Sequence, residues 1–306
     1  MQVDKILGNY DERYFGLGHK QTTYSEIFDI HETDGNFIGY VALRQDSCWS
    51  KKKNIVATPH LSSLDGIVLA VLMVEKYLEK MAPWLSLETL LVESFEIKAG
   101  ATPIEDLSRI PVKLKKMNQD KETYTATIHI LSMKINLSLR QYDLDLVVPE
   151  NESNISYVAT HLKSLTHDLT NIDLLSEKYA NCDVVRECIS KPSYSGVSSC
   201  YSASVSIFEW LIIVSQLAQV MAYNFDKITR CDSDTLWMRT IKAEIKKPLP
   251  YTKPLLVIGE IVKSTSLKRG EDEWRILEMQ GGTIGEDVIF SGNIAHKIPT
   301  HLGDIS

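Results

Sequence analysis

The sequence predicts an α+β fold made of two similar units, each with one long buried helix and an antiparallel sheet. In the second half, residues 207–223 are apolar on nearly every side, and a helix of that composition has to be buried. Strand-like runs rich in alternating or β-branched residues follow this helix. They lie at 235–239, 254–263, 273–280 and 285–294, with Gly281-Gly282 expected to form the turn between the last two. A sheet that wraps one long helix is the outline of a hotdog domain.

The first half repeats this order with different residues. Two strand-like runs precede residues 67–77, which are apolar through most of their length and predict a second buried helix. Four further strand-like runs come after it. The runs of this half lie at 24–31, 37–44, 88–98, 109–116, 122–131 and 133–141. We therefore predict a tandem (double) hotdog fold, in which each antiparallel sheet wraps its own central helix.

The boundary between the halves is expected between about 145 and 185. A polar, turn-rich stretch at 149–154 follows the last N-terminal strand. Beyond it, a leucine stripe over 156–180 predicts a connecting helix, with Leu162, Leu165, Leu169, Leu174 and Leu175. The predicted domains are an N-terminal hotdog-like domain at 1–150, a connecting helical segment at 151–182 and a C-terminal hotdog-like domain at 183–306.

Composition indicates a soluble globular protein and excludes several classes of partner. The chain has 306 residues, of which 44% are hydrophobic and 24% charged, so two ordinary cores fit. A net charge of −7 argues against nucleic acid, which requires a basic surface. The longest apolar run, Ile207–Val214, is too short to span a bilayer, and no signal peptide follows Met1. Five cysteines without a CxxC pair indicate free thiols in a reducing cytoplasm.

No metal or cofactor motif is recognisable in the sequence. The eight histidines are scattered and show neither HxH nor HExxH spacing. No Walker sequence is present, and no GxGxxG opens a helix after a strand. We therefore predict no metal site and no cofactor, and expect a substrate that carries its own activation.

Glu209 is the first candidate for catalysis, because it is a carboxyl group near the start of the buried helix. The positive end of the helix dipole favours the carboxylate, whereas burial raises its pKa. Such a group could act as general acid or base on a thioester or keto substrate. It could equally be a structural carboxyl hydrogen-bonded to the serine-rich loop 198–206, and the sequence leaves both readings open.

His60 and Asp65 lie at the start of the first helix. Ser62 or Ser63 is a plausible N-cap, and Asp65 then falls in the first turn, where a negative charge is stabilising. Capping therefore explains Asp65 without any catalytic role, although catalysis remains the alternative. His60 has no such local explanation, and we expect it to orient against Asp65 or to hydrogen-bond a substrate carbonyl.

Three further residues are candidates for substrate binding. Tyr201 could donate a hydrogen bond to an acyl carbonyl, whereas Cys200 has no nearby basic residue and is better explained as a packed thiol. Trp237 and Arg239 are two apart on a predicted strand and so are expected to face the same side. Arg239 could hold a phosphate or carboxylate against the indole, or be a surface cation packed on a tryptophan.

Several segments resemble the avirulence D (AvrD) proteins of plant-pathogenic bacteria. The resemblance extends over the whole chain and rests on these motifs: Val3-Asp4-Lys5-Ile6-Leu7-Gly8, Tyr14-Phe15-Gly16, Pro59-His60-Leu61-Ser62-Ser63-Leu64-Asp65-Gly66, Ser199-Cys200-Tyr201, Ser215-Gln216-Leu217-Ala218-Gln219 and Asp234-Thr235-Leu236-Trp237-Met238-Arg239. Proteins of that family direct production of syringolides, which are acylated, sugar-derived elicitors. The resemblance thus implies condensation of a β-ketoacyl thioester with a five-carbon ketose such as xylulose.

The same family is similar in layout to the enzymes of A-factor biosynthesis, which transfer a β-ketoacyl group to a hydroxyl of a triose phosphate. By that analogy, residues 215–219 resemble the Glu-Ala-x-Gln segment of many hotdog helices. Ser215 then stands where dehydratase relatives carry a catalytic carboxylate, which puts simple dehydratase chemistry in doubt. The resemblance adds Ser215 and Ser199 to Tyr201, Trp237 and Arg239 as substrate-binding candidates.

The resulting hypothesis is an acyltransferase with its site in the groove between the two units. The acyl chain, delivered as a thioester of coenzyme A or acyl carrier protein, would run along the central helices. Glu209, His60 or Asp65 would deprotonate the sugar hydroxyl, and backbone N–H groups would stabilise the oxyanion. The competing classes are a non-catalytic acyl-binding module and a hotdog dehydratase or hydratase. A monomer and a homodimer are both compatible with two units in one chain.

Overall fold

The fold described below is that of a computed structural model of the whole chain. The structure describes residues 1–45, 49–52, 55–100, 102–142, 153–190, 192–233, 236–251, 255–270 and 272–299. Most of the predicted polar boundary at 149–154, Cys48 and the start of the predicted strand at 235–239 lie outside the described residues.

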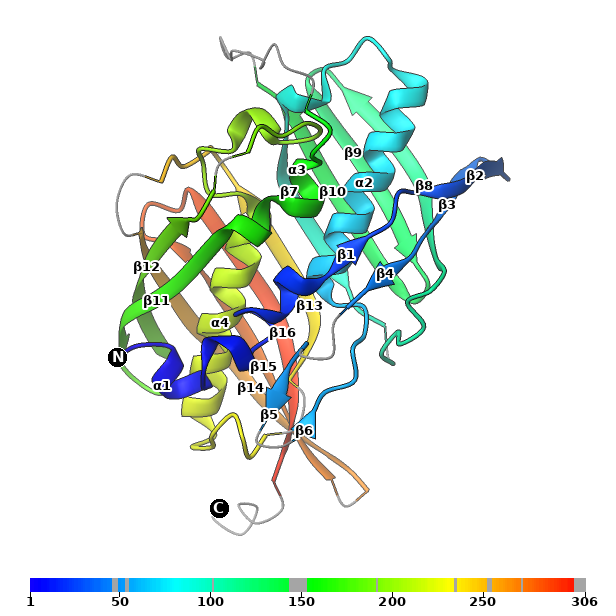
Figure 1. Cartoon of the computed structure of the whole chain (residues 1–306). Helices are drawn as coiled ribbons and strands as arrows, with labels where there is room; N and C mark the ends of the chain where they lie inside the picture. The colour runs from blue at the N-terminus through cyan, green and yellow to red at the C-terminus, as the bar shows by residue number, and fades with distance from the viewer. Residues whose placement is uncertain are drawn as a thin grey trace.

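One antiparallel sheet of twelve strands forms the back of the molecule, and two long helices lie against it (Figure 1). The spatial order of the strands is β11-β12-β14-β15-β16-β13-β7-β10-β9-β8-β3-β2. The N-terminal strands are β2 (Phe28–Thr33), β3 (Asn36–Val41), β7 (Leu90–Lys98), β8 (Ile110–Asp120), β9 (Thr123–Ile130) and β10 (Met133–Gln141). The C-terminal strands are β11 (Leu165–Leu174), β12 (Tyr179–Cys188), β13 (Trp237–Ile245), β14 (Leu255–Arg269), β15 (Asp272–Thr283) and β16 (Val288–Ile298). The central helices are α2 (Ser63–Met81) and α4 (Ile207–Phe225).

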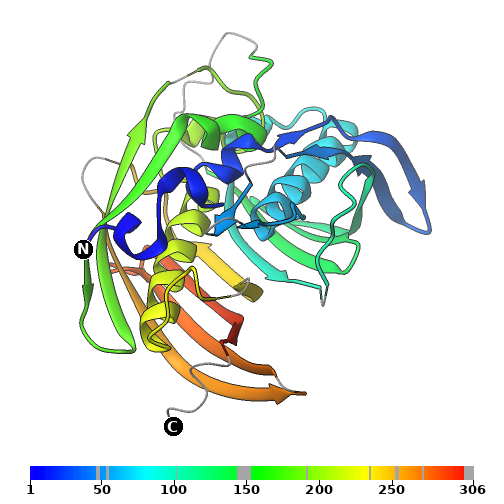
Figure 2. The ribbon, with the colours of Figure 1, turned by 60° about the horizontal axis from the view of Figure 1, so that its bottom comes forward.

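The chain folds the same unit twice. In each half two paired strands come first, then the long helix, then four strands, and the spatial order of the six strands is the same in both halves. Each half-sheet curves around its own helix, as Figure 2 shows most clearly for α4. The predicted tandem hotdog fold is therefore confirmed.

The two half-sheets join edge to edge, through one edge strand of each. β13 pairs with β7 in antiparallel register, with Ala243 opposite Phe95. Each of these strands carries a bulge, where the pairing to the neighbouring strand of its own unit shifts by one residue. The unpaired residues are Glu93 in β7 and Arg239 in β13. The bulges bend both strands next to the junction, where a cavity lies between the units.

Both central helices begin with the same local device. Ser62 caps α2 and Ser206 caps α4, and each serine oxygen accepts the backbone N–H of the acidic residue three positions later. The side chains of Asp65 and Glu209 return the bond to the backbone N–H of their capping serine. These two capping boxes define where the helices start. Most side chains of both helices are buried, as the nearly continuous apolar sequence predicts.

The predicted connecting helix over 156–180 is wrong in its greater part. Only the short α3 (Tyr157–Thr160) and one 3₁₀ turn (His161–Ser164) are helical, and the segment then forms β11 and β12. Leu165, His167 and Leu169 are buried, while the residues between them are only partly buried. This period of two is that of a strand, and it overrides the helical leucine spacing. The C-terminal unit consequently begins near residue 157 and not at 183.

Two smaller differences concern the ends of strands. Gly281 and Gly282 lie within β15, and the turn to β16 is formed by residues 284–287. The N-terminal residues, for which no structure was predicted, run beside β11 and cover α4 (blue in Figure 2). Val3 N–H donates to Leu169 O, and Ile172 N–H donates to Met1 O. The N-terminus thereby covers an otherwise open sheet edge.

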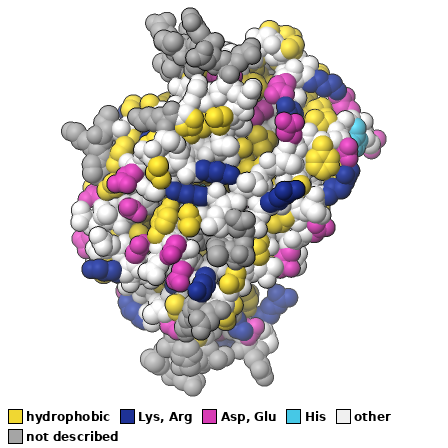
Figure 3. Space-filling model, viewed as in Figure 1, with side chains coloured by type: hydrophobic (Ala, Val, Ile, Leu, Met, Phe, Trp, Pro, Cys, Tyr) yellow, Lys and Arg dark blue, Asp and Glu magenta, His cyan; other side chains and the backbone are white. Residues whose placement is uncertain are grey.

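Charged side chains of both signs lie on the surface. On the face shown in Figure 3, basic and acidic side chains are interspersed and form no continuous basic stripe. Among the helices that the structure describes, none is long and apolar enough to cross a membrane.

Candidate functional site

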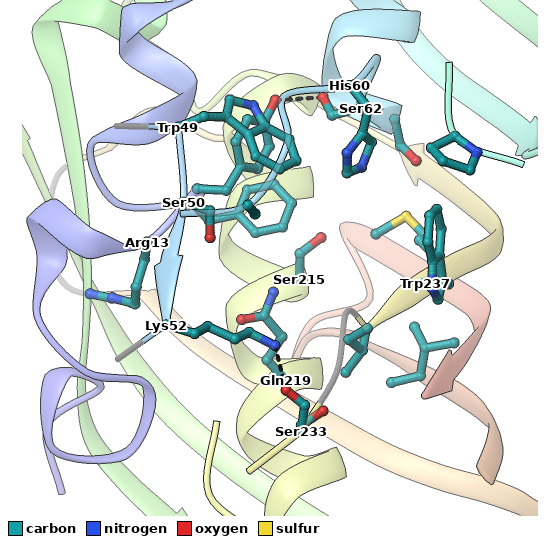
Figure 4. Close-up of a pocket in the computed structure, with 18 of the residues that line it drawn as sticks. Arg13, Trp49, Ser50, Lys52, His60, Ser62, Ser215, Gln219, Ser233 and Trp237 are labelled. Carbon is teal, nitrogen blue, oxygen red and sulfur yellow. Dashed lines mark hydrogen bonds between the residues drawn. The ribbon is translucent and has the colours of Figure 1, made fainter. Parts of the chain in front are cut away.

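A cavity of about 620 Å³ lies where the two units meet. Its walls come from both central helices, from the start of β13 and from loops of the N-terminal unit (Figure 4). The lining segments are 13–15, 49–50 with 52, 55–58 with 60–63, 99–100 with 102–105, 215–216 with 218–219, 230–233 and 236–238, together with Met133, Tyr223 and Ile294. The site therefore depends on residues that are far apart in the sequence.

His60 is held between two tryptophans at the wall of this cavity. Its ring centroid is 4.5 Å from that of Trp49 and 5.8 Å from that of Trp237. His60 Nδ1 lies 3.1 Å from the carbonyl oxygen of Thr58. Because a carbonyl oxygen can only accept, Nδ1 is the donor in this bond, and Nε2 is the ring nitrogen left free to accept. That arrangement is the one a general base requires.

Ser215 and Gln219 face the cavity from successive turns of α4 (Figure 4). Ser215 is buried, yet its hydroxyl has no hydrogen-bond partner among the described residues. A buried hydroxyl without a partner costs about 1–3 kcal/mol, so a ligand oxygen at this position would be stabilising. The neighbouring Gln216 is occupied, because its Oε1 accepts from Arg13 Nη1 at 2.8 Å.

Asp65 lies behind this wall and does not line the cavity. Its carboxylate accepts from the Ser62 hydroxyl at 2.7 Å and from the Tyr24 hydroxyl at 2.8 Å. Burial raises the pKa of Asp65, although the hydrogen bonds from Ser62 and Tyr24 oppose that rise. Tyr14 and Ser62, which do line the cavity, are 2.5 Å apart through their hydroxyl oxygens. Asp65 thus positions Ser62 and the start of α2, in agreement with the capping interpretation.

Glu209 is placed as a structural carboxylate at the start of α4. Its side chain is fully buried and accepts from Arg186 Nε at 2.5 Å and from His167 Nε2 at 2.8 Å. Burial alone would raise its pKa, but His167 and Arg186 outweigh burial and lower the pKa to about 2. A carboxylate that is fully paired and outside the cavity is not positioned to take a proton from a substrate. Of the two readings that the sequence left open, the geometry supports the structural one.

The sequence predicts that Trp237 and Arg239 face the same side, but only Trp237 lines the cavity. Trp237 and Met238 both line the cavity, whereas Arg239 is the bulged residue and lies outside the lining. The bulge interrupts the alternation of side chains along β13. Arg239 donates from Nη1 to the carbonyl oxygen of Gly100 at 3.0 Å and so fastens the loop that borders the cavity.

One end of the cavity is bordered by basic residues from three separate segments, Arg13, Lys52 and Arg230. Lys52 donates to the carbonyl oxygen of Ser233 at 3.0 Å, an interaction visible in Figure 4. Arg230 is buried and donates to the carbonyl oxygens of Lys51 and Glu12. These contacts connect the N-terminal segment, the β5–β6 hairpin (Lys51–Lys52 and Ile55–Val56) and the turn after α4, which together close this end.

The corresponding position in the other unit is filled by the chain itself. Glu75 and Gln219 each lie thirteen residues after the serine that caps their helix. Gln219 faces open space in the cavity, whereas Glu75 accepts the backbone N–H of Val197 at 2.7 Å. A Cβ added at Gly196 would come within 2.6 Å of Glu75 Oε1. Burial raises the pKa of Glu75 to about 8, against the lowering effect of the Val197 bond.

Ser199 and Tyr201 belong to this filled side and not to the cavity. Ser198, in a left-handed conformation with φ of 69°, accepts the backbone N–H of Val92 on its hydroxyl at 3.1 Å. The Tyr201 hydroxyl donates to the carbonyl oxygen of Thr89 at 3.0 Å. Both contacts fasten the segment 196–201, which we call the plug, to the start of β7. The predicted role of Tyr201 as a donor to an acyl carbonyl is therefore replaced by a structural one.

Within the described residues, the open cavity between the units and the filled position in the N-terminal unit together predict one ligand per chain. Isothermal titration with a non-cleavable acyl-pantetheine thioether should give one site per chain, because the plug occupies the second position. Tyr201→Phe, which removes only the bond to Thr89, should leave the affinity within about twofold, since the cavity is untouched. Two equivalent sites, or a large loss of affinity in Tyr201→Phe, would contradict this assignment.

The structure brings together three of the eight predicted site residues: His60, Ser215 and Trp237. Asp65, Glu209, Ser199, Tyr201 and Arg239 lie outside the cavity lining. Trp49 and Gln219 are cavity residues that we did not single out from the sequence. Gln219 is visible only as part of the segment 215–219, and nothing local in the sequence distinguishes Trp49.

Comparison with known proteins gives matches at the level of structure and family. No curated protein matches the chain. Among solved structures, it is similar to a tesB protein of Mycobacterium avium subsp. paratuberculosis, with 9% identity, a TM-score of 0.45 and coverage of 89% of this chain and 96% of that one. An acyl-CoA thioesterase II, TesB2, from Mycobacterium marinum has 7% identity, a TM-score of 0.42 and coverage of 88% and 93%. A trans-AT PKS dehydratase domain from Brevibacillus brevis has 8% identity, a TM-score of 0.39 and coverage of 90% and 98%.

The four described cysteines, Cys182, Cys188, Cys200 and Cys231, are free thiols.

The family comparison covers nearly the whole sequence, since the model described as Pseudomonas avirulence D protein (AvrD) matches residues 1–299. The chain therefore belongs to the AvrD family.

Proposed function

We propose that this protein is an acyltransferase that condenses a β-ketoacyl thioester with a ketose of the xylulose type, giving an acylated sugar of the syringolide kind. The observation that carries the proposal is that Ser215 and His60 line the same cavity. Ser215 supplies a buried hydroxyl without a partner among the described residues, and His60 supplies an available Nε2. One group can bind an acyl carbonyl and the other can accept a proton.

The proposed reaction needs only these groups and the two substrates. His60 Nε2 takes the proton of a ketose hydroxyl, and the sugar oxygen attacks the thioester carbonyl carbon. The Ser215 hydroxyl donates to the carbonyl oxygen while negative charge develops there. The carbon–sulfur bond then breaks, and His60 returns the proton to the departing thiolate. The products are the acylated ketose and a free thiol.

Two tryptophans lie against His60, which is itself only partly buried. Trp49 and Trp237 cover the two sides of the imidazole, and Trp49 is itself buried. Bound substrates that displace the remaining water would strengthen the hydrogen bond to the developing oxyanion and limit hydrolysis of the thioester. The thioester of coenzyme A or of an acyl carrier protein would enter as a substrate, and the mechanism assigns no role to a bound cofactor.

The test is thiol release from a medium-chain β-ketoacyl thioester, measured with and without xylulose. We expect release that depends on the ketose, together with a product whose mass equals that of the acylated sugar. Release without ketose would identify a thioesterase, and an enoyl thioester would identify a dehydratase. Tight binding of the thioester without any turnover would identify an acyl-binding module. Each of these three outcomes contradicts the proposed transfer.

A further inference from the structure

A second, smaller space adjoins the cavity behind Ser215. This recess has a volume of about 60 Å³ and lies between α4 and the inner face of β13–β16. It shares Ser215, Ala218, Met238 and Ile294 with the cavity, so the two spaces meet at these side chains. Figure 2 shows α4 lying along the concave face of the strands that form the recess floor.

Glycines keep the floor of the recess bare. Gly259 in β14 lies directly opposite Gly281 in β15, so two adjacent strands lack a side chain at the same level. A Cβ at Gly281 would lie 2.3 Å from the carbonyl oxygen of Ile258, and one at Gly292 would lie 2.6 Å from that of Thr240. Real Cβ contacts are not that short, so Gly281 and Gly292 are required by the backbone. Gly259 is the one of these three glycines whose missing Cβ leaves room toward α4, and Met221 lies there.

The walls of the recess are mostly apolar, and they include flexible side chains. Met221 from α4, Met238 from β13 and Met279 from β15 line it, and none of its lining residues in the described part of the chain is charged. Methionine side chains are unbranched and can move to fit ligands of different size. The recess therefore suits an unbranched hydrocarbon and excludes a sugar or a phosphate.

We propose that the recess binds the distal end of the acyl chain, and that Gly259 and Met221 set the longest chain that the protein accepts. This inference rests on the proposed function only in naming the ligand as an acyl thioester. With its carbonyl at Ser215, the chain would pass between Ala218 and Met238 into the recess. Further methylenes then meet Met221, whose sulfur lies over Gly259.

The geometry at Gly259 gives the expected effect of two opposite changes. A Cβ at this position would lie 2.7 Å from Met221 Sδ and 3.3 Å from Leu217 Cδ2. Gly259→Ala should therefore shorten the recess, and Met221→Ala should lengthen it. Each buried methylene contributes about fourfold to binding. Gly259→Ala should lower affinity for the longest accepted chain at least about fourfold and leave shorter chains unchanged, whereas Met221→Ala should extend the gain to chains one or two methylenes longer.

The experiment is isothermal titration with a homologous series of S-(2-oxoalkyl)pantetheine thioethers, which carry the carbonyl but cannot be cleaved. The N-terminal unit offers matched controls. Gly39 is a strand glycine whose added Cβ would lie 2.4 Å from Ile27 Cγ2 and 3.2 Å from Met73 Cε, and Met73 belongs to α2. Gly39→Ala and Met73→Ala place similar changes in the core without touching the recess.

A shift of the chain-length optimum in opposite directions for Gly259→Ala and Met221→Ala, with no shift in the controls, is the expected result. If Gly259→Ala does not fold, the lengthening predicted for Met221→Ala still decides the matter. An unchanged optimum, or an equal loss at all chain lengths, would overturn the inference. The titration measures binding alone, so its result does not depend on the proposed reaction. If the chain-length optimum shifts but the separate assay finds no sugar-dependent thiol release, the proposed transfer is contradicted and the recess assignment is supported.

Discussion

Replacing His60 by glutamine is expected to lower kcat for ketose-dependent thiol release by about 10²–10⁴-fold. Glutamine can keep a hydrogen bond with Thr58 and fill much of the space between Trp49 and Trp237. It cannot accept a proton at neutral pH, so the sugar hydroxyl remains protonated. Affinity for a non-cleavable acyl thioether should stay nearly unchanged, because the acyl chain is held by α4 and the recess.

His31 provides the matched control for this substitution. It lies on β2 at the outer edge of the N-terminal half-sheet, and its Nδ1 also lies near a backbone carbonyl, that of Asp29, at 2.9 Å. His31→Gln should leave kcat unchanged. Full activity in His60→Gln, with folded protein, would remove His60 from the mechanism.

Replacing Glu209 by glutamine is expected to destabilise the fold by about 3–5 kcal/mol, because it leaves the Arg186 guanidinium without its buried counter-charge. The measurement is the free energy of unfolding in urea at neutral pH. The other unit supplies the comparison, since Asp65 occupies the same capping position with neutral hydroxyl donors and an amide around it. Asp65→Asn removes no ion pair, so its cost should be clearly smaller.

The same ion pair predicts how stability depends on pH. The pKa of Glu209 is lowered in the folded protein from 4.5 to about 2. The stabilisation is therefore fully present above about pH 4.5 and is lost as the pH falls toward 2, because the unfolded state binds the proton more readily. Urea titrations across this window should show the loss in the wild type and a smaller slope in Glu209→Gln. Equal slopes, or a Glu209→Gln protein of native stability that has lost only activity, would restore the catalytic assignment.

The fold could be predicted largely because its signals are local. The period of two in the strands and the largely apolar content of 207–223 are properties of neighbouring residues, and both survive in β7–β10 and α4. The helix predicted over 156–180 was wrong because the spacing of its leucines fits both the helical period and the strand period of two. Leu162, Leu165 and Leu169 are three and four residues apart, as on a helix, yet Leu165 and Leu169 also alternate with less buried residues. The segment forms a strand because it pairs with β12. Analysis of neighbouring residues alone cannot identify that partner.

The site could be predicted only in part, because its residues meet through the pairing of two units. His60 could be singled out from the sequence because no local structural role explains it. Asp65 could be explained as part of a capping box with Ser62, which the structure contains. Ser206 and Glu209 form the same capping pattern, which the sequence displays. The two side chains that donate to Glu209 from other elements are Arg186 and His167, and they come from two different strands. No spacing in the sequence indicates that they converge.

The plug, residues 196–201, is a second feature that the sequence alone could not predict. Ser199 and Tyr201 lie in a polar loop before a buried helix, which is a reasonable place for a binding site. What removes them from the cavity is the contact of Val197 with Glu75, 122 residues away in the chain. Open and filled positions are therefore distinguished by tertiary contacts and not by the motifs that flank the two helices.

The most direct test of the account is a crystal structure of the protein with an S-(2-oxoalkyl)pantetheine thioether. The account predicts one ligand per chain, with its carbonyl oxygen within hydrogen-bond distance of Ser215 Oγ, His60 beside the carbonyl carbon, and the alkyl end between Met221 and Gly259. A ligand bound against the plug at Ser199 and Tyr201, or outside the cavity between the two units, would contradict it.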